Sequence, residues 1–149
     1  MEIRQICKPT SEMELAQFED KLNRRLPEDY RQFLLKHNGG EPHPSTFFIS
    51  QGQGEDDIRH FLGMSEMKEY SLVHYYEIYS GRIPQNLLPI APDYFSNLVC
   101  LSIDGADRGS VYFWDHDWEV VEGEPDYSNV QLLAEGFDDF LERLYTYGR

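Results

Sequence analysis

The stretch that decides the fold is LPEDYRQFLLKHNGG, residues 26–40. Pro27 stands where the first turn of a helix tolerates a proline, and Glu28 and Asp29 follow at the positive end of the helix dipole. Residues 38–40, Asn-Gly-Gly, accept the left-handed backbone conformation that ends helices. The stretch therefore predicts a helix that stops sharply at residue 38.

Three further helices are predicted outside this stretch. Before it, Ser11 and Glu14 have the spacing of a capping box, and apolar residues recur at helical spacing up to about Arg25. After it, apolar and aromatic side chains crowd into residues 67–79 and predict a middle helix. Near the end of the chain, residues 137–145 place apolar side chains on one face and acidic ones on the other, as in an amphipathic helix.

Short runs of β-branched and aromatic residues predict the strands. TFFI at 46–49 is the first, the polar segment 50–57 indicates an exposed loop, and IRHFLGM at 58–64 is the expected returning strand. Prolines at 84, 89 and 92 exclude a regular helix before Asn97. The first half of the chain is therefore expected to contribute one hairpin beside its helices.

The clearest strand signal is the pair LVCLSI at 98–103 and GSVYFWDH at 109–116, which flank an Asp-Gly turn and predict a hairpin. WEVV at 118–121 is expected to add a third antiparallel strand. Because no internal repeat or linker divides the chain, we predict a single α+β domain over residues 1–149. An antiparallel sheet of about four to six strands would pack with N-terminal, middle and C-terminal helices.

The charge of the chain is strongly negative, with 27 acidic and 13 basic residues and a net charge of −14. Residues 90–149 hold 13 of the acids and only 3 of the bases. Such a surface repels phosphate backbones and anionic lipids and attracts basic proteins. We therefore expect no direct binding to nucleic acid or membrane. Without a long apolar stretch or a signal-peptide pattern, the protein is expected to stay in the cytoplasm.

Nothing in the sequence favours an enzyme. The five histidines occur singly, and the chain has no GxSxG, HExxH, P-loop or GxGxxG motif. The cysteines, Cys7 and Cys100, are too few for a disulfide framework or a zinc cluster. We therefore expect neither catalysis nor a cofactor.

One set of acids partly resembles a calcium loop: Asp115, Asp117, Glu119 and Asp126. The resemblance fails because Val120 stands where such a loop needs glycine and Asp126 stands where it needs a bidentate glutamate. Alternate acids on a strand would simply share one solvated face. We therefore predict no metal site.

The acidic segment, residues 104–126, contains eight acids and one base, Arg108. A solvated charged surface is one interpretation of this segment. The other is a partner-binding surface, because crowded like charges oppose folding unless a partner compensates them. Four aromatic residues are interleaved with the acids, and they would be interface anchors if exposed and core residues if buried. They are Tyr112, Trp114, Trp118 and Tyr127.

Three stretches together resemble the SUKH superfamily, in particular its Smi/Knr-type branch. They are LPEDYRQFLLKHNGGEP from residue 26, the strand pair LVCLSI and GSVYFWDH, and GFDDFLERL from residue 136. The resemblance spans residues 11–146 and implies an α+β fold. In it, Leu26, Phe33 and Leu34 resemble core positions, and Asn38 to Gly40 resemble a chain reversal.

The resemblance also implies a function, that of a bacterial immunity protein that binds and blocks a toxin delivered by neighbouring cells. Many such toxins are nucleases, and an acidic protein can occupy a basic phosphate groove as a decoy. The alternative is a regulatory protein-interaction module related to cell-wall assembly regulators. For either, we expect a protein partner, a basic toxin domain in the first case, and a monomer or weak homodimer.

The candidate partner-binding residues come from the loop 50–57 and the acidic segment, because variable loops specialise such scaffolds. They are Glu55, Asp56, Asp57, Asp104, Asp107, Asp115, Asp117, Trp118, Glu119, Glu122, Glu124 and Asp126.

Overall fold

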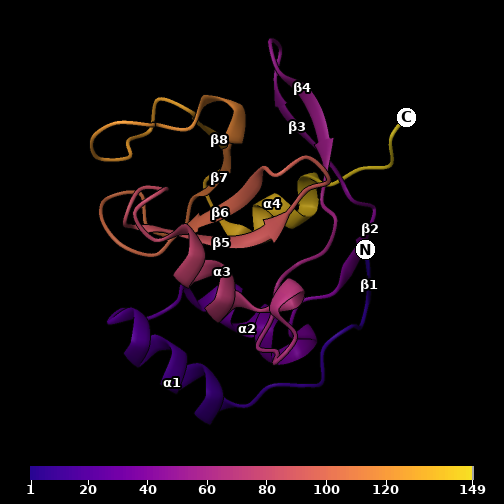
Figure 1. Cartoon of the computed structure of the whole chain (residues 1–149). Helices are drawn as coiled ribbons and strands as arrows, with labels where there is room; N and C mark the ends of the chain where they lie inside the picture. Colours follow the sequence, from indigo (N-terminus) through magenta and orange to yellow (C-terminus); the bar gives the residue numbers. More distant parts are fainter. Residues whose placement is uncertain (149) are drawn as a thin grey trace.

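The largest sheet has four antiparallel strands that lie side by side in chain order (Figure 1). The strands are β5 (Leu87–Pro92), β6 (Leu98–Ser102), β7 (Val111–Trp114) and β8 (Val130–Ala134). This sheet combines with four α-helices in the computed structural model, which describes residues 1–148. The predicted α+β class is confirmed.

The predicted hairpin is confirmed by β6 and β7, whose antiparallel register starts with Leu98 opposite Trp114. The prediction that WEVV continues the sheet is wrong. Residues His116–Trp118 form a short 3-10 turn, and the strand beside β7 is β8. The chain leaves the sheet here because the Asp115 carboxylate accepts a hydrogen bond from the backbone N–H of Asp117 at 3.0 Å, which caps the turn.

Two smaller sheets lie beside the large one. β1 (Glu2–Arg4) pairs with β2 (Glu41–His43), and β3 (Thr46–Ser50) pairs with β4 (Gly54–Asp57). The β3–β4 hairpin projects from the body of the molecule (Figure 1). The prediction that 58–64 is the returning strand is wrong, because the chain reverses within residues 51–53 and Gly54 follows with a φ of 77°. The candidate acids Glu55 to Asp57 are therefore strand residues, not loop residues.

The four helices are α1 (Glu12–Leu22), α2 (Glu28–His37), α3 (Leu72–Tyr79) and α4 (Phe137–Arg143). α1 ends before the predicted Arg25 because Asn23 takes a left-handed conformation with a φ of 57°. The middle helix starts at Leu72 rather than 67, since a 3-10 turn precedes it and the Ser71 side chain caps it. The helix that ends the domain is confirmed but stops at Arg143.

Both faces of the four-stranded sheet carry buried side chains. On one face, Leu88 and Phe113 belong to the main core, which they share with side chains of α1, α2 and α4. On the other face, Cys100 and Trp114 form a smaller core against Tyr79 of α3. Successive residues of β7 thus point into different cores, as the alternation of a strand requires.

The Asn-Gly-Gly signature ends α2 as predicted and also ties three segments together. Asn38 is left-handed, with a φ of 48°, and its amide donates hydrogen bonds to the carbonyls of Lys8 at 2.7 Å and Met64 at 3.0 Å. Gly39, with a φ of 85°, lies so close to residue 61 that a Cβ atom there would be 2.6 Å from the Phe61 carbonyl oxygen. The signature is therefore a packing junction as well as a helix end.

Candidate partner-binding surface

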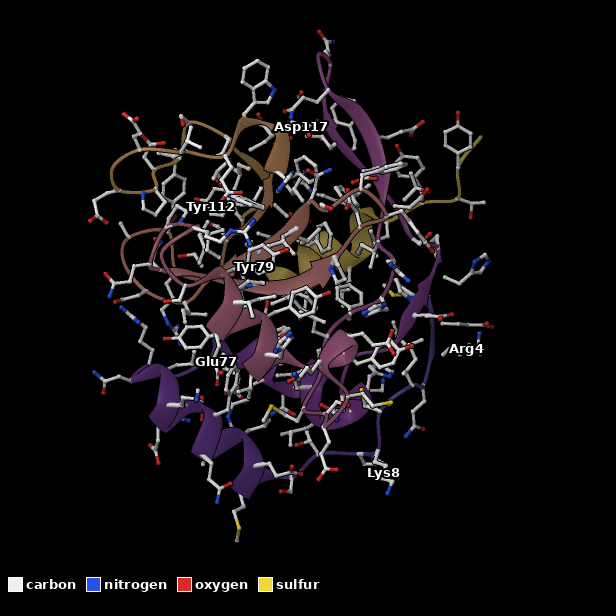
Figure 2. The ribbon with its side chains drawn as sticks, viewed as in Figure 1. Arg4, Lys8, Glu77, Tyr79, Tyr112 and Asp117 are labelled. Carbon is white, nitrogen blue, oxygen red and sulfur yellow. The ribbon has the colours of Figure 1, made fainter. Side chains whose placement is uncertain are left out.

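The tip of the β3–β4 hairpin meets the acidic segment at one end of the molecule. The Gln53 side-chain amide donates a hydrogen bond to Asp115 Oδ2 at 3.3 Å, although the two residues are 62 positions apart. The two stretches from which the candidate residues were drawn thus lie side by side. Figure 2 shows Asp117 at this end, whereas Arg4 and Lys8 lie toward the other end of the molecule.

The turn after β7 is held by hydrogen bonds from two neighbouring segments. Asp115 and Asn129 are bonded twice, through the Asp115 N–H to the Asn129 carbonyl at 3.0 Å and through the Asn129 amide to the Asp115 carbonyl at 2.9 Å. The backbone N–H of His116 donates to Asn97 Oδ1 at 2.9 Å. The turn is therefore fixed to the residue that precedes β8 and to the residue that precedes β6.

A third tie joins the turn to the segment after α3. The Arg82 guanidinium binds both carboxylate oxygens of Glu119, at 2.9 and 3.0 Å, and its carbon lies 4.5 Å from the centre of the Tyr79 ring. This contact with Arg82 lowers the pKa of the Glu119 carboxyl. Glu119, one of the candidate binding residues, is thus already paired within the chain.

Trp118 projects from this fixed turn with 76% of its surface exposed. Of the four interleaved aromatics, Trp114 is buried in the smaller core, and Tyr112 and Tyr127 donate their hydroxyl hydrogens to Asp107. Among these four, only Trp118 is neither buried in a core nor bonded to Asp107. An exposed indole on an ordered turn is typical of interface anchors, because little side-chain or backbone freedom is lost on binding.

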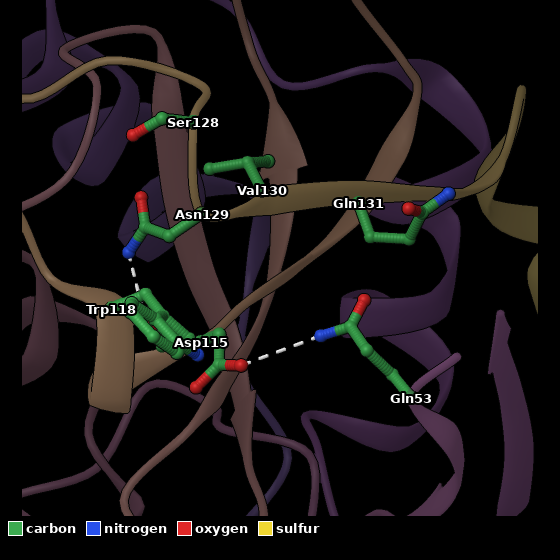
Figure 3. Close-up of a pocket in the computed structure, with 7 residues that line it drawn as sticks. All are labelled: Gln53, Asp115, Trp118, Ser128, Asn129, Val130 and Gln131. Carbon is green, nitrogen blue, oxygen red and sulfur yellow. Dashed lines mark hydrogen bonds between the residues drawn. The ribbon is translucent and has the colours of Figure 1, made fainter.

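Beside Trp118 lies a pocket of about 360 Å³ between the hairpin tip and the start of β8 (Figure 3). Its lining combines one carboxylate, side-chain amides, a hydroxyl and the indole. The lining residues are Gln53, Asp115, Trp118, Ser128, Asn129, Val130 and Gln131.

The loop from Val120 to Asp126 carries three more of the candidate acids. Glu122, Glu124 and Asp126 are exposed, and within residues 1–148 none of them lies within 4.0 Å of a lysine, arginine or histidine nitrogen. Asp126 accepts a hydrogen bond from the backbone N–H of Ser128 at 2.9 Å. The Ser128 side chain, and after it this backbone bond, lower the pKa of the Asp126 carboxyl. The loop therefore presents exposed negative charge that no basic side chain of the described residues pairs.

Asp107 holds the far end of this loop. It accepts hydrogen bonds from Ser102, Tyr112 and Tyr127 at 2.8, 2.7 and 2.9 Å. Burial alone would raise the pKa of Asp107, but these hydrogen bonds outweigh it and lower the pKa. Its carboxylate is saturated by partners within the chain.

Three further candidates, Asp104, Asp57 and Glu55, also have side-chain partners within the chain. Asp104 is bound by Arg24 at 2.8 Å, which lowers the pKa of its carboxyl. Asp57 accepts a hydrogen bond from Thr46 at 2.6 Å, and Glu55 accepts one from the Tyr145 hydroxyl. The structure thus separates acids that are bonded within the fold from exposed acids without a basic partner among residues 1–148, which are Asp117 and the acids of the 120–126 loop.

Asp56 is a special case among the candidates. Its Oδ2 atom is buried and has no hydrogen-bond partner among the described residues, and it faces the buried Asp93. Burial, and after it the side chain of Asp93 and the nearby negative charges, raise the pKa of Asp56 to about 8. The raised pKa means that this half-buried carboxyl contributes less negative charge at neutral pH than its sequence neighbours.

Sequence reasoning missed the residues that orient the surface. Arg82, Asn97 and Asn129 lie outside the acidic cluster, and their roles arise only when β6, β7 and β8 pair. Gln53 is not among the predicted binding residues, because that prediction rests on acidic and aromatic side chains. The Gln-Gly-Gln turn that carries it was the one available signal.

The described residues offer neither a metal site nor a membrane span. Across residues 1–148, no group of three His, Cys, Asp or Glu side chains is arranged to hold a metal ion. No helix in this range is long and apolar enough to cross a membrane.

By its fold and surface, the protein is an α+β domain in which helices pack on an antiparallel sheet. Its acidic surface lies at the end of the molecule where the β3–β4 hairpin tip meets the turn after β7. The chain belongs to the SMI1/KNR4 family (SUKH-1), whose family model matches residues 9–143. The chain is also 30% identical over 145 residues to an uncharacterized SPbeta prophage-derived protein, YokK, of Bacillus subtilis (strain 168). That match covers 86% of this chain and 71% of the relative. The expected family is confirmed.

Proposed function

We propose that the protein is an immunity protein that binds a cognate toxin domain and neutralises it by stoichiometric docking in the cytoplasm, without catalysis. The observation that carries the proposal is Trp118, an exposed indole on a turn fixed from three sides, which lines a pocket with the Asp115 carboxylate and follows the exposed Asp117 in sequence. Family membership and similarity to a prophage-derived protein support it.

The charge of the surface favours a basic partner, in particular a nuclease. A nuclease keeps a positive groove for phosphates, and Asp117, Glu122, Glu124 and Asp126 offer the groove exposed carboxylates instead. Charges at the rim of an interface mainly raise the association rate, while a central aromatic anchor mainly slows dissociation. The two contributions can therefore be measured separately.

The first test measures binding to the toxin domain encoded beside the gene of this protein. Trp118→Ala is expected to weaken the complex by about 30-fold, mostly through faster dissociation, because a hot-spot anchor contributes about 2 kcal/mol or more. Tyr147→Ala is the matched control, since Tyr147 is 71% exposed but lies outside the pocket. If the wild-type protein forms no complex at micromolar concentration and does not protect sensitive cells, the proposal fails and the regulatory alternative gains support.

The second test reverses charge without touching the internal ion pairs. Changing Asp117, Glu122 and Glu124 to lysine is expected to slow association about 10-fold or more at low salt, and added salt should shrink the difference. The control changes Glu2, Asp20 and Glu66, exposed acids on other parts of the chain, to lysine. Equal slowing by both triple variants would show that total charge, not this surface, guides the encounter.

A further inference from the structure

The pocket beside Trp118 has the chemistry of a receptor for a planar cation. Asp115 supplies the carboxylate, Gln53 and Gln131 supply amide oxygens, and Trp118 supplies an aromatic surface. Figure 3 shows Gln53 on the hairpin turn directed toward Asp115, with Trp118 beside Asp115 and Gln131 on β8 on the same side of the view as Gln53. Val130 is the single aliphatic side chain among the lining residues described.

The Asp115 carboxylate has spare capacity to accept hydrogen bonds. Its Oδ1 accepts from the Asp117 N–H at 3.0 Å and its Oδ2 accepts from Gln53 at 3.3 Å, one bond for each oxygen. A carboxylate oxygen has about two lone pairs, so each oxygen can accept another bond. Within residues 1–148, no lysine, arginine or histidine nitrogen lies within 4.0 Å of Asp115. The half-buried charge is therefore uncompensated in the free protein.

Among protein side chains, arginine matches this lining best. Its planar guanidinium carries five N–H donors in a fork that suits a carboxylate, and its flat face stacks on aromatic rings. A lysine ammonium is a compact point charge that would use the carboxylate but gain less from the indole plane. The bond from Gln53 to Asp115 is long and would be displaced at small cost.

We propose that the Gln53–Asp115–Trp118 pocket binds one arginine side chain of the partner, with its guanidinium on the Asp115 carboxylate and against the Trp118 ring. The inference deepens the proposed function and rests on it for the source of the arginine. It also names the docking point: the toxin should present an arginine at the centre of its contact with this end of the molecule.

The test uses small probes and no toxin. N-acetyl-arginine amide is titrated into the ¹⁵N-labelled full chain, and N-acetyl-lysine amide and N-acetyl-citrulline amide are titrated in parallel. Arginine should cause saturable shifts of the Trp118 indole N–H and of the Gln53 and Gln131 side-chain amides. Lysine should bind at least about threefold more weakly, and citrulline, which is nearly isosteric but neutral, should not saturate the site.

Two variants assign the site. Asp115→Asn keeps a residue that caps the turn equally well but removes the charge, and it should weaken arginine binding about 10-fold, as expected for a lost charge-assisted hydrogen bond. Asp20→Asn, the same change at an exposed acid outside the pocket, should leave the affinity within about twofold. Equal shifts with citrulline, or equal losses in the two variants, would overturn the proposal.

The probe titration separates this inference from the proposed function. If arginine does not saturate the pocket but the toxin domain binds, the arginine site is wrong and the immunity function stands. If arginine binds as described but no toxin complex forms, the pocket stands as an arginine site and its assignment to a toxin fails.

Discussion

At the scale of single residues, the family signature connects parts of the chain that are distant in sequence. Asp29, predicted from its position to favour the dipole of α2, also accepts hydrogen bonds from the backbone N–H groups of Phe137 at 3.1 Å and Asp138 at 3.2 Å. It thereby caps α4, whose own N-cap residue, Gly136, has no side chain to do so. One carboxylate therefore joins the start of α2 to the start of α4.

The first prediction concerns this cap. Asp29→Ala should lower the free energy of unfolding by about 1–2 kcal/mol, because two N–H groups of α4 lose their acceptor. Urea denaturation followed by circular dichroism measures the change. Glu28→Ala is the control, since Glu28 is also a first-turn acid of α2 but bonds only to Gln32 in its own helix. A loss of the same size in both variants would mean that the dipole of α2, not the cap of α4, accounts for the effect.

The second prediction compares two glycines that share a φ of 85°. Gly39→Ala would bring a Cβ atom to 2.6 Å from a backbone oxygen, whereas Gly81 has open space around it. Gly81→Ala should cost about 1 kcal/mol for the left-handed conformation alone. Gly39→Ala should cost at least about 3 kcal/mol more, or prevent folding, because backbone cannot move aside as a flexible side chain would. Thermal denaturation of the pair checks this, and equal losses would contradict the packing role of Gly39.

At the scale of elements, the correct predictions are those that depend on residues close together in the sequence. The bounds of α2 and the β6–β7 hairpin follow from caps and turn residues within a few positions, and both are confirmed. The strand that pairs with β7 could not be predicted in this way, because WEVV at 118–121 and VQLLA at 130–134 both have the composition of a strand. The choice is made by the capped turn at Asp115 and by pairing across the sheet. Likewise, nothing local showed that Gln53 would reach Asp115.

The third prediction tests whether the ion pair after α3 orders the Trp118 turn. Arg82→Ala should increase fast motion of the Trp118 indole, seen as a lower ¹H–¹⁵N heteronuclear NOE of its N–H, since Glu119 loses both of its bonds to Arg82. Global stability should fall by about 1 kcal/mol or less, because the pair is partly exposed. The control, Arg143→Ala, removes a surface pair with Asp139 and should leave the indole unaffected. An unchanged NOE in Arg82→Ala would show that the asparagine contacts suffice.

At the scale of the whole molecule, acids with lowered and with raised pKa values make stability respond to pH in opposite ways. The lowered pKa values of Asp107 and Glu119 mean that their contributions to stability are present at neutral pH and are lost as the pH falls through those values. The raised pKa of Asp56 has the reverse effect, because the folded state holds a proton that the unfolded chain releases. The contribution of Asp56 to stability should therefore decline as the pH rises from the ordinary range of an aspartate to about 8.

The fourth prediction isolates this decline above pH 7. The lowered pKa of His60, caused mainly by burial, makes stability rise with pH only up to about its ordinary value, so it does not act in this window. Asp56→Asn should remove the remaining fall in stability between pH 7 and 8. At pH 8 it should stabilise the fold by about 1–3 kcal/mol, because the neutral amide faces Asp93 without losing a proton. Urea melts at several pH values measure this, and a slope that persists in the variant would assign it elsewhere.

The exposed hairpin turn also makes the molecule suitable as an optical sensor. A side chain added at Gly52 would meet no atom within 4 Å, and the native thiols Cys7 and Cys100 are buried. A Gly52→Cys variant would therefore offer a single accessible thiol for a fluorescent label, one residue from Gln53 at the mouth of the pocket. Because Trp118 lines the same pocket, quenching between label and indole would report its occupancy in real time, without a labelled ligand.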